Sequence, residues 1–120
     1  MTRRVLVAVT DLFFLTRIES TAAQIGVALE RSSLDQLVAR CSSAPPDLVV
    51  IDLHAAGEPL EVARELKRGS ATLGIPILAF YSHVESALRR QALEAGIDHV
   101  LPRSAFTARL AEWLAGRAEA

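Results

Sequence analysis

Short apolar runs alternate along this chain with longer stretches in which apolar positions recur every three or four residues. A continuous apolar run of about four to eight residues is typical of a strand that is buried on both faces, whereas the longer spacing is typical of a helix with one apolar side. The apolar runs predict strands at residues 4–9, 26–29, 48–52, 77–81 and 99–101.

The segments between these runs have helical spacing. A capping box, Ser-x-x-Gln or Ser-x-x-Glu, begins at Ser33 and at Ser82, and a serine in this pattern is expected to accept a bond from the first helical turn. Gly96 and Gly116 stand where a left-handed residue can end a helix. We predict helices at residues 12–24, 33–41, 59–68 and 82–95, and a last helix that is capped by Ser104 and has Phe106, Leu110, Trp113 and Leu114 on its inner face.

Strands that alternate with helices predict βαβ units and therefore a parallel sheet with helices on both faces. We expect an α/β protein of flavodoxin-like topology: a three-layer sandwich around a five-stranded parallel sheet of order 2-1-3-4-5. The pattern shows no linker, repeat or low-complexity tract, so residues 1–120 are expected to form a single domain.

Composition narrows the function. The 120 residues carry a formal net charge of −1, and the basic residues are scattered, so nucleic acid and anionic membrane are not expected partners. Cys41 is the only cysteine, which excludes an intrachain disulfide and a zinc cluster; its place in a helical pattern predicts a half-buried thiol. No apolar run has membrane-spanning length and the start lacks a signal-peptide core, so we expect a cytoplasmic protein.

The run PDLVVIDL contains the first candidate for chemistry. Its buried strand ends in one acid, Asp52, which is followed by a loop. The carboxyl ends of the strands are the side of an open α/β sheet on which ligands and chemistry collect. Asp52 is therefore the leading candidate site residue.

Three segments resemble the receiver domain of bacterial response regulators. PDLVVIDL is similar to that family's third strand and phosphoacceptor aspartate, IPILAFYS to its fourth strand, and ALEAGIDHVLPRSAF to its fourth helix, fifth strand and final-helix start. The resemblance implies that an aspartate receives a phosphoryl group from a histidine kinase. It also implies a Mg²⁺ held partly by an acidic pair after the first strand, a lysine after the fifth strand and a switch hydroxyl after the fourth.

The metal-binding part of this pattern is altered. Asp52 matches the phosphoacceptor, but the acidic pair falls on Val9 and Thr10, and only the next residue, Asp11, is acidic. A charge pair at about 4 Å is worth on the order of 4 kcal/mol at an effective dielectric of 20. We therefore expect no firmly bound cofactor, with Asp11 and Asp52 able to hold Mg²⁺ only weakly.

The other two positions are altered as well. The lysine position falls on Arg103, and the only lysine of the chain, Lys67, lies in the third predicted helix. Arginine keeps the charge but is planar and bulkier. The switch hydroxyl position falls on Tyr81, with Ser82 beside it.

Each of these residues also has a structural explanation. Asp52 can be an acid that bonds loop amides or pairs with Arg103, and Arg103 can equally be a solvated surface arginine. Asp11 can be an acid in the first turn of a helix, where it is favourable to the helix dipole. Ser82 can be a helix cap, and the ring of Tyr81 can pack over the mouth of the site.

Two further features concern the surroundings of Asp52. Phe13 and Phe14 point about 100° apart on a helix, so we expect that one of them fills the mouth above Asp52, where the acidic pair and metal would be. DLHAAG matches the cobalamin-binding signature D-x-H-x-x-G through Asp52, His54 and Gly57. That signature follows the first strand in its own family and the third strand here, so we rank it last.

The leading prediction is a stand-alone, atypical receiver-like domain, not an enzyme, that signals by binding a protein, either a sensor kinase or a downstream signalling protein. Its partner face is expected on the fourth helix, fifth strand and final helix, and homodimerisation through that face is also plausible, although Trp113 can instead be core. The alternative is a working receiver phosphorylated on Asp52. The residues of the expected face are Ala87, Arg90, His99, Arg109 and Trp113.

Overall fold

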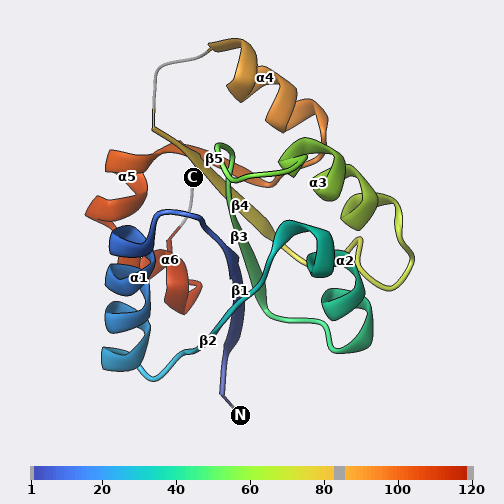
Figure 1. Ribbon diagram of the computed structural model, residues 1–120. Helices are drawn as coiled ribbons and strands as arrows, with labels where there is room; N and C mark the ends of the chain where they lie inside the picture. Colours follow the sequence, from blue (N-terminus) through green and yellow to red (C-terminus); the bar gives the residue numbers. More distant parts are fainter. Residues whose placement is uncertain (1, 83–85, 119–120) are drawn as a thin grey trace.

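The computed structural model describes residues 2–82 and 86–118 (Figure 1). Its five strands are all parallel and lie in the order β2-β1-β3-β4-β5, which confirms the flavodoxin-like prediction. The elements are β1 (Arg4–Ala8), α1 (Leu12–Gln24), β2 (Ala28–Arg31), α2 (Leu34–Ser43), β3 (Leu48–Asp52), α3 (Pro59–Arg68), β4 (Ile77–Tyr81), α4 (Ser86–Glu94), β5 (His99–Pro102), α5 (Arg103–Ala108) and α6 (Leu110–Ala115).

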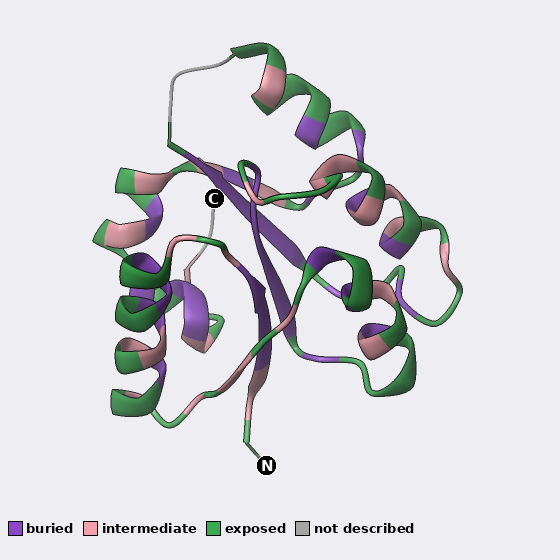
Figure 2. Cartoon of the chain, viewed as in Figure 1, coloured by how far each residue is buried: buried purple, intermediate pink, exposed green. Residues whose placement is uncertain are grey.

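The sheet separates two apolar clusters, and its central strands are the most buried part of the molecule (Figure 2). Every residue of β3 and β4 is buried, as continuous apolar runs predict for strands covered on both faces. Helices α1, α5 and α6 cover one face, whereas α2, α3 and α4 cover the other. Three layers therefore position the carboxyl ends of the strands at one edge.

An aromatic cluster joins α1, β4 and α5 on the first of these faces. The ring centroids of Phe14 and Phe80 are 5.1 Å apart, and those of Phe80 and Phe106 are 5.3 Å apart. Phe14 also meets Phe106 edge-on at 6.0 Å. Such pairs stabilise beyond the area that they bury, so this cluster holds the first turns of α1 and α5 close together.

The second strand lies two residues later than predicted, at Ala28–Arg31 instead of 26–29. The reason is the end of α1. Gly26 has φ 74°, and the N–H of Val27 donates to the carbonyl of Ala22 at 2.9 Å, which is the bond of a Schellman cap. These residues therefore close the helix and are not available to the sheet. The first strand also ends one residue early, at Ala8.

The predicted serine caps are the least accurate part of the prediction. Ser33 is the N-cap of α2, but its side chain makes no capping bond, and the helix extends to Ser43. The box that begins at Ser82 reaches residue 85, which lies outside the described residues, and α4 begins at Ser86. Gly96 does close α4, with φ 94°.

The last helix is divided in two and begins at Arg103, directly after β5, so that Pro102 and not Ser104 is its N-cap. The hydroxyl of Thr107 donates to the carbonyl of Arg103 at 2.8 Å, and such bonds bend helices. The helix is interrupted at Arg109, and the next helix, α6, begins at Leu110. Gly116 ends α6 at φ 78°, and the four predicted inner-face residues, Phe106, Leu110, Trp113 and Leu114, are all buried.

Cys41 is more buried than predicted. It is fully enclosed in the cluster beneath α2 and α3 instead of being half-buried, and burial raises the pKa of its thiol. Buried thiols of this kind are unreactive. Within the described residues, no helix combines the length and the apolar character needed to cross a membrane.

Candidate functional site

Asp52 ends the central strand β3 at the carboxyl edge of the sheet, as predicted, and only 7% of it is exposed. Its Oδ1 accepts a hydrogen bond from the backbone N–H of His54 at 2.8 Å. The carboxylate is therefore held by the loop that follows its own strand. Of the two structural roles considered for Asp52, a bond to a loop amide or an ion pair with Arg103, the structure has the bond to the loop amide.

The surroundings of Asp52 disfavour its charged form. Burial raises the pKa of Asp52, and the negative charge of Asp11 acts in the same direction. The bond from the His54 N–H and the positive charge of Arg103 oppose this shift but do not cancel it. Burial therefore dominates over the nearby arginine, a balance that the sequence left open.

Asp11 is the N-cap of α1. Its Oδ1 accepts from the backbone N–H groups of Phe13 at 3.0 Å and Phe14 at 3.2 Å, and its Oδ2 accepts from Nη2 of Arg103 at 2.9 Å. The Phe14 N–H and then the Arg103 guanidinium lower the pKa of Asp11 below its usual range. Asp11 is thus the cap that precedes the first turn, whereas the alternative had placed it within that turn, and both of its oxygens are engaged.

Arg103 begins α5 and is neither the partner of Asp52 nor a purely solvated arginine. Its guanidinium makes the ion pair with Asp11, and its Cζ lies 4.0 Å from the centroid of the Phe14 ring. The ring face and the carboxylate together hold the cation. The positive charge of Arg103 is therefore committed to α1, although its field still reaches Asp52.

The donor groups at this edge fit a magnesium ion poorly. Mg²⁺ requires near-octahedral oxygen ligands and usually takes carboxylates. The two residues after β1, Val9 and Thr10, carry no carboxylate, and Asp11 is bound to Arg103. Over residues 2–82 and 86–118, no three His, Cys, Asp or Glu side chains gather into a group that could hold a metal. We assign no step to a metal ion.

Tyr81 and Ser82 follow β4. Tyr81 is 9% exposed and belongs to the apolar cluster beneath α2, α3 and α4, so its ring is packed in the core and does not lie over the mouth of the site. Ser82 is exposed and is the last described residue before α4.

The expectation that one of Phe13 and Phe14 fills the mouth above Asp52 is wrong for Phe13 and stays a prediction for Phe14. Phe14 turns into the aromatic cluster under Arg103, and Phe13 turns outward, with 92% of it exposed. Val9 and Thr10 also line an open cavity.

This cavity, here named the switch-point pocket, has a volume of about 280 Å³. It lies where the sheet order reverses around β1, the place at which open α/β sheets bind ligands. Sequence reasoning missed it; the available signal was the absence of a carboxylate at Val9 and Thr10, directly after the first strand. Its lining residues are Ala8, Val9, Thr10, Ser32, Ser33, Leu34, Asp35, Ala55 and Ala56.

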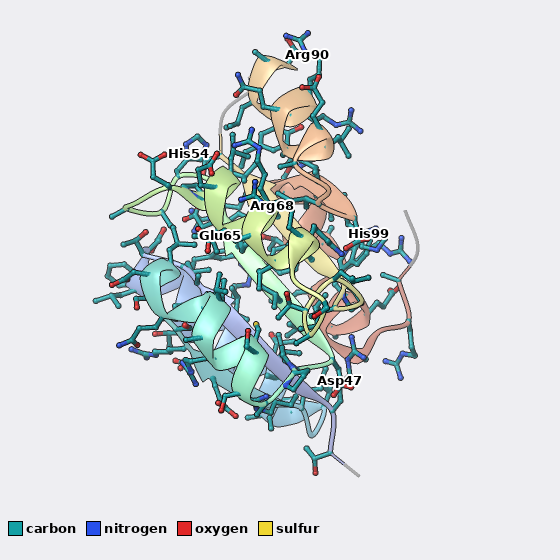
Figure 3. The ribbon with its side chains drawn as sticks, turned by 90° about the vertical axis from the view of Figure 1, so that its right-hand side faces the viewer. Asp47, His54, Glu65, Arg68, Arg90 and His99 are labelled. Atoms are coloured by element: carbon teal, nitrogen blue, oxygen red, sulfur yellow. The ribbon has the colours of Figure 1, made fainter. Side chains whose placement is uncertain are left out.

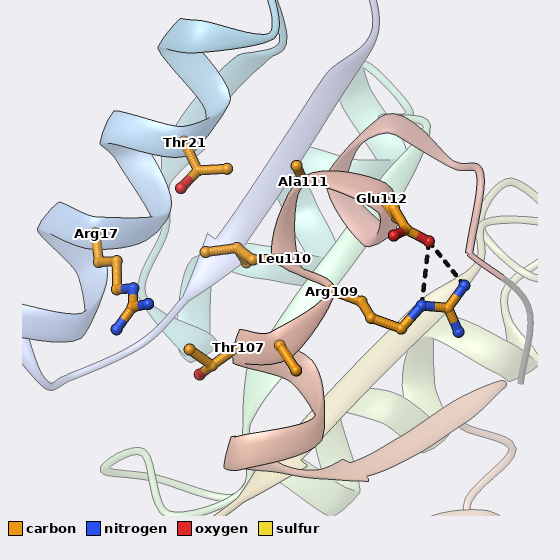
Figure 4. A pocket seen from close by; sticks show the side chains of 8 residues that line it. Arg17, Thr21, Thr107, Arg109, Leu110, Ala111 and Glu112 are labelled. Carbon is orange, nitrogen blue, oxygen red and sulfur yellow. Dashed lines mark hydrogen bonds and ion pairs between the residues drawn. The ribbon is translucent and has the colours of Figure 1, made fainter.

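A second cavity of about 270 Å³ lies where α1 faces the break between α5 and α6 (Figure 4). Arg17 and Thr21 approach it from α1, and Arg109 forms a 2.8 Å ion pair with Glu112 on its other side. This cavity is open to solvent. Arg109 and Glu112 pair with each other, and Arg17 is exposed. The cavity carries no chemistry that connects to Asp52.

Of the residues expected on the partner face, one belongs to the core. Trp113 is buried, and its ring lies 5.0 Å from that of His99, so Trp113 is core, as the alternative held. Arg90 lies on α4, far from His99 (Figure 3). Its Nε is 3.9 Å from Oε1 of Glu94, one helical turn further along α4.

The segment that matches the cobalamin signature forms the loop between β3 and α3. Its aspartate is buried and bonded to the backbone of His54, and the His54 residue itself is exposed. Gly57 supplies the turn with φ 116°. The segment is thus a tight loop after the third strand, and its position still argues against the cobalamin interpretation.

Comparison with known proteins places the fold. No family model matches the chain, and no curated protein matches its sequence. Solved structures do match it, and those reported below are receiver domains or response regulators with the same CheY-like flavodoxin fold.

Three of these structures illustrate the likeness. The chemotaxis protein CheY4 of Vibrio cholerae has a TM-score of 0.83 at 15% identity, over 98% of this chain and all 100% of that one. A putative response regulator from Chloroflexus aurantiacus has a TM-score of 0.82 at 17% identity, over 96% and 99%. The receiver domain of the Pseudomonas aeruginosa sensor kinase PA1611, with magnesium coordinated in its active-site cleft, has a TM-score of 0.80 at 18% identity, over 97% and 99%. At these identities the likeness establishes the fold.

Proposed function

We propose that this protein is an atypical receiver module of two-component signalling, which acts by binding a protein partner while phosphorylation of Asp52 is impaired or absent. The partner is a sensor kinase or a downstream signalling protein. The observation that supports this proposal is the Asp11–Arg103 ion pair of 2.9 Å. Asp11 is the acid that follows Val9 and Thr10, where the resemblance implies the acidic pair, and Arg103 stands where it implies the lysine.

The physical argument concerns charge. Phosphoryl transfer depends mainly on positioning and on neutralising the charge of the transferred group. In this protein the positive charge of Arg103 already faces Asp11, and the donor set for a divalent cation is incomplete. In addition, burial raises the pKa of Asp52, which favours the protonated form over the nucleophilic carboxylate. All three effects act against formation of an acyl phosphate.

A second candidate is a working phosphoacceptor. The position of Asp52 favours it, because this acid ends the central strand in the fold of the receivers and lies within the field of Arg103. In this case Arg103 would leave Asp11 when the phosphoryl group arrives. The two candidates differ in one measurable property, which is the reactivity of Asp52.

The test is treatment with acetyl phosphate and Mg²⁺, followed by intact-protein mass spectrometry, with beryllofluoride and amide chemical shifts as a second readout. We expect no stoichiometric mass gain and no Asp52-dependent shift. Asp52→Asn removes the candidate nucleophile, and Glu65→Gln, an exposed acid on α3, serves as the matched control. A mass gain that is lost in Asp52→Asn but kept in Glu65→Gln would establish the working phosphoacceptor and end the proposal.

A further inference from the structure

Phe13 is the most exposed large apolar side chain of the described residues. It is 92% exposed, and Leu12 beside it is 65% exposed, both in the first turn of α1 at the carboxyl edge of the sheet. Asp11 fixes this turn through its bonds to the backbone of Phe13 and Phe14. The ring is therefore presented outward by a well-held helix start, and not by a loose loop.

The same edge carries a cavity that such a ring would fit. The switch-point pocket begins at the end of β1, and its member Thr10 precedes Phe13 by three residues. A cavity of about 150 Å³ lined by apolar side chains binds benzene, and this pocket has about 280 Å³. Its walls are mainly apolar, with hydroxyls among them, and its apolar lining residues are Ala8, Val9, Leu34, Ala55 and Ala56.

The charges beside the ring and beside the pocket are opposite. Arg17 follows Phe13 by one helical turn and so lies on the same side of α1. Asp35 is an exposed member of the pocket lining. In the described part of the chain, neither Arg17 nor Asp35 takes part in a salt bridge. A ring that entered the pocket of another molecule would bring these two charges to the same interface.

We propose that the occupant of the switch-point pocket is a second copy of this chain. Each copy inserts Phe13 into the pocket of the other and sets Arg17 against the other's Asp35, around a two-fold axis. A two-fold interface uses the same patch on both subunits, so the patch must carry both a projection and its complement. This edge carries both, and the Asp11–Arg103 pair within it is internally neutralised. The interface is distinct from the face expected on α4, β5 and α5, and its partner copy covers the entrance above β1.

The first test is the mass of the full chain in solution over a wide concentration series, measured by sedimentation equilibrium. We expect a reversible dimer. Phe13→Ser is expected to raise the dissociation constant by at least about a hundredfold, because two buried rings are lost. Leu93→Ser is the matched control, since Leu93 is another exposed apolar residue, 43% exposed, on α4. A chain that is monomeric throughout, or a dimer that is unaffected by Phe13→Ser, overturns the proposal.

One mixing experiment and one charge swap identify the contacts. Ala56→Trp fills the pocket from an exposed loop position and is expected to give a monomer. Mixing Phe13→Ser with Ala56→Trp leaves one intact ring and one open pocket, so a heterodimer should form more tightly than either variant dimerises alone. Likewise Arg17→Glu and Asp35→Arg should each weaken the dimer, and the double variant should restore it. Failure of the mixture to form any heterodimer contradicts the arrangement.

Discussion

Asp11 and Arg103 are 92 positions apart in the chain and form a 2.9 Å ion pair at the carboxyl edge of the sheet. Asp11 caps α1, whereas Arg103 begins α5 and lies over the ring of Phe14. Asp11 thus has two roles: it caps the N-terminal end of α1, and it pairs with the positive charge of Arg103, which acts on Asp52. The properties of Asp52 should therefore depend on a residue that it does not contact directly.

The first prediction removes the charge of Asp11 but keeps the cap. Asn is as good an N-cap as Asp, so Asp11→Asn should leave α1 intact. The change removes a negative charge that raises the pKa of Asp52, and it frees Arg103, whose charge lowers that pKa. We expect the pKa of Asp52 to fall, as measured by carbon NMR titration of its carboxyl group. Glu65→Gln is the control, and an unchanged pKa in Asp11→Asn would contradict this coupling.

The second prediction concerns stability and pH. The pKa of Asp52 is raised in the folded state, so the folded protein binds this proton more tightly than the unfolded chain does. Below the unfolded pKa of about 3.9 both states are protonated, and the residue carries no penalty. As pH rises through the window up to the folded pKa, stability is lost and then stays lower.

Asp52→Asn should remove this loss, because the amide oxygen can still accept the N–H of His54 at no charge cost. The variant is expected to be more stable than the parent at neutral pH, and the difference should shrink at acidic pH. Urea unfolding at several pH values measures it. A variant that is less stable at neutral pH would show that the carboxylate is favourably paired.

The third prediction compares two adjacent rings. Phe14 is 3% exposed and contacts Phe80, Phe106 and the guanidinium of Arg103, whereas Phe13 is 92% exposed. Phe14→Ala should reduce the free energy of unfolding by about 3–5 kcal/mol. Phe13→Ala should change it by no more than about 0.5 kcal/mol in the monomer. Thermal and urea denaturation at low protein concentration separate the two, and equal losses would be inconsistent with this packing.

The fourth prediction concerns Glu30 on β2. Glu30 accepts from Nε of Arg4 at 2.7 Å and from Nη2 of Arg40 at 2.8 Å, so it joins β1, β2 and α2. The bond from Arg4 lowers the pKa of Glu30. A lowered pKa means stability that is present above the unfolded value of about 4.3 and is lost as pH falls through the folded pKa.

Glu30→Gln should therefore destabilise the protein at neutral pH and have little effect in acid. Because all three side chains are partly exposed, the loss should be about 1 kcal/mol or less, and smaller in high salt. Unfolding of parent and variant at neutral and acidic pH, with and without added salt, checks this. Glu65→Gln again provides the control, and a loss that persists in acid would point to packing and not to charge.

Much of the fold could be predicted because the spacing of apolar residues indicates the type of each element and the turn residues indicate where it ends. The third and fourth strands were predicted to the residue, since continuous apolar runs are unambiguous when both faces are covered. The second strand was misplaced because Gly26 and Val27 continue the apolar run in the sequence, whereas in the structure they form the C-terminal cap of α1. The break at Arg109 had no sequence signal of glycine or proline, and it follows a side-chain bond from Thr107.

The site was only partly predictable, for a different reason. The position of Asp52 follows from its own strand, which is local information. The pairing of Asp11 with Arg103 depends on how closely the starts of α1 and α5 approach each other on one face of the sheet, and no spacing in the chain reports that distance. The switch-point pocket is set by three loops at once, so only the loss of charge at Val9 and Thr10 hinted at it.

The full enclosure of Cys41 has a practical consequence. As the only thiol of the chain, it lies on the buried side of α2 with no exposure in the native state. A thiol reagent can therefore reach it only when that part of the structure opens. The labelling rate of the unmodified protein would then report the opening free energy around α2, with no introduced probe and no disulfide to interfere.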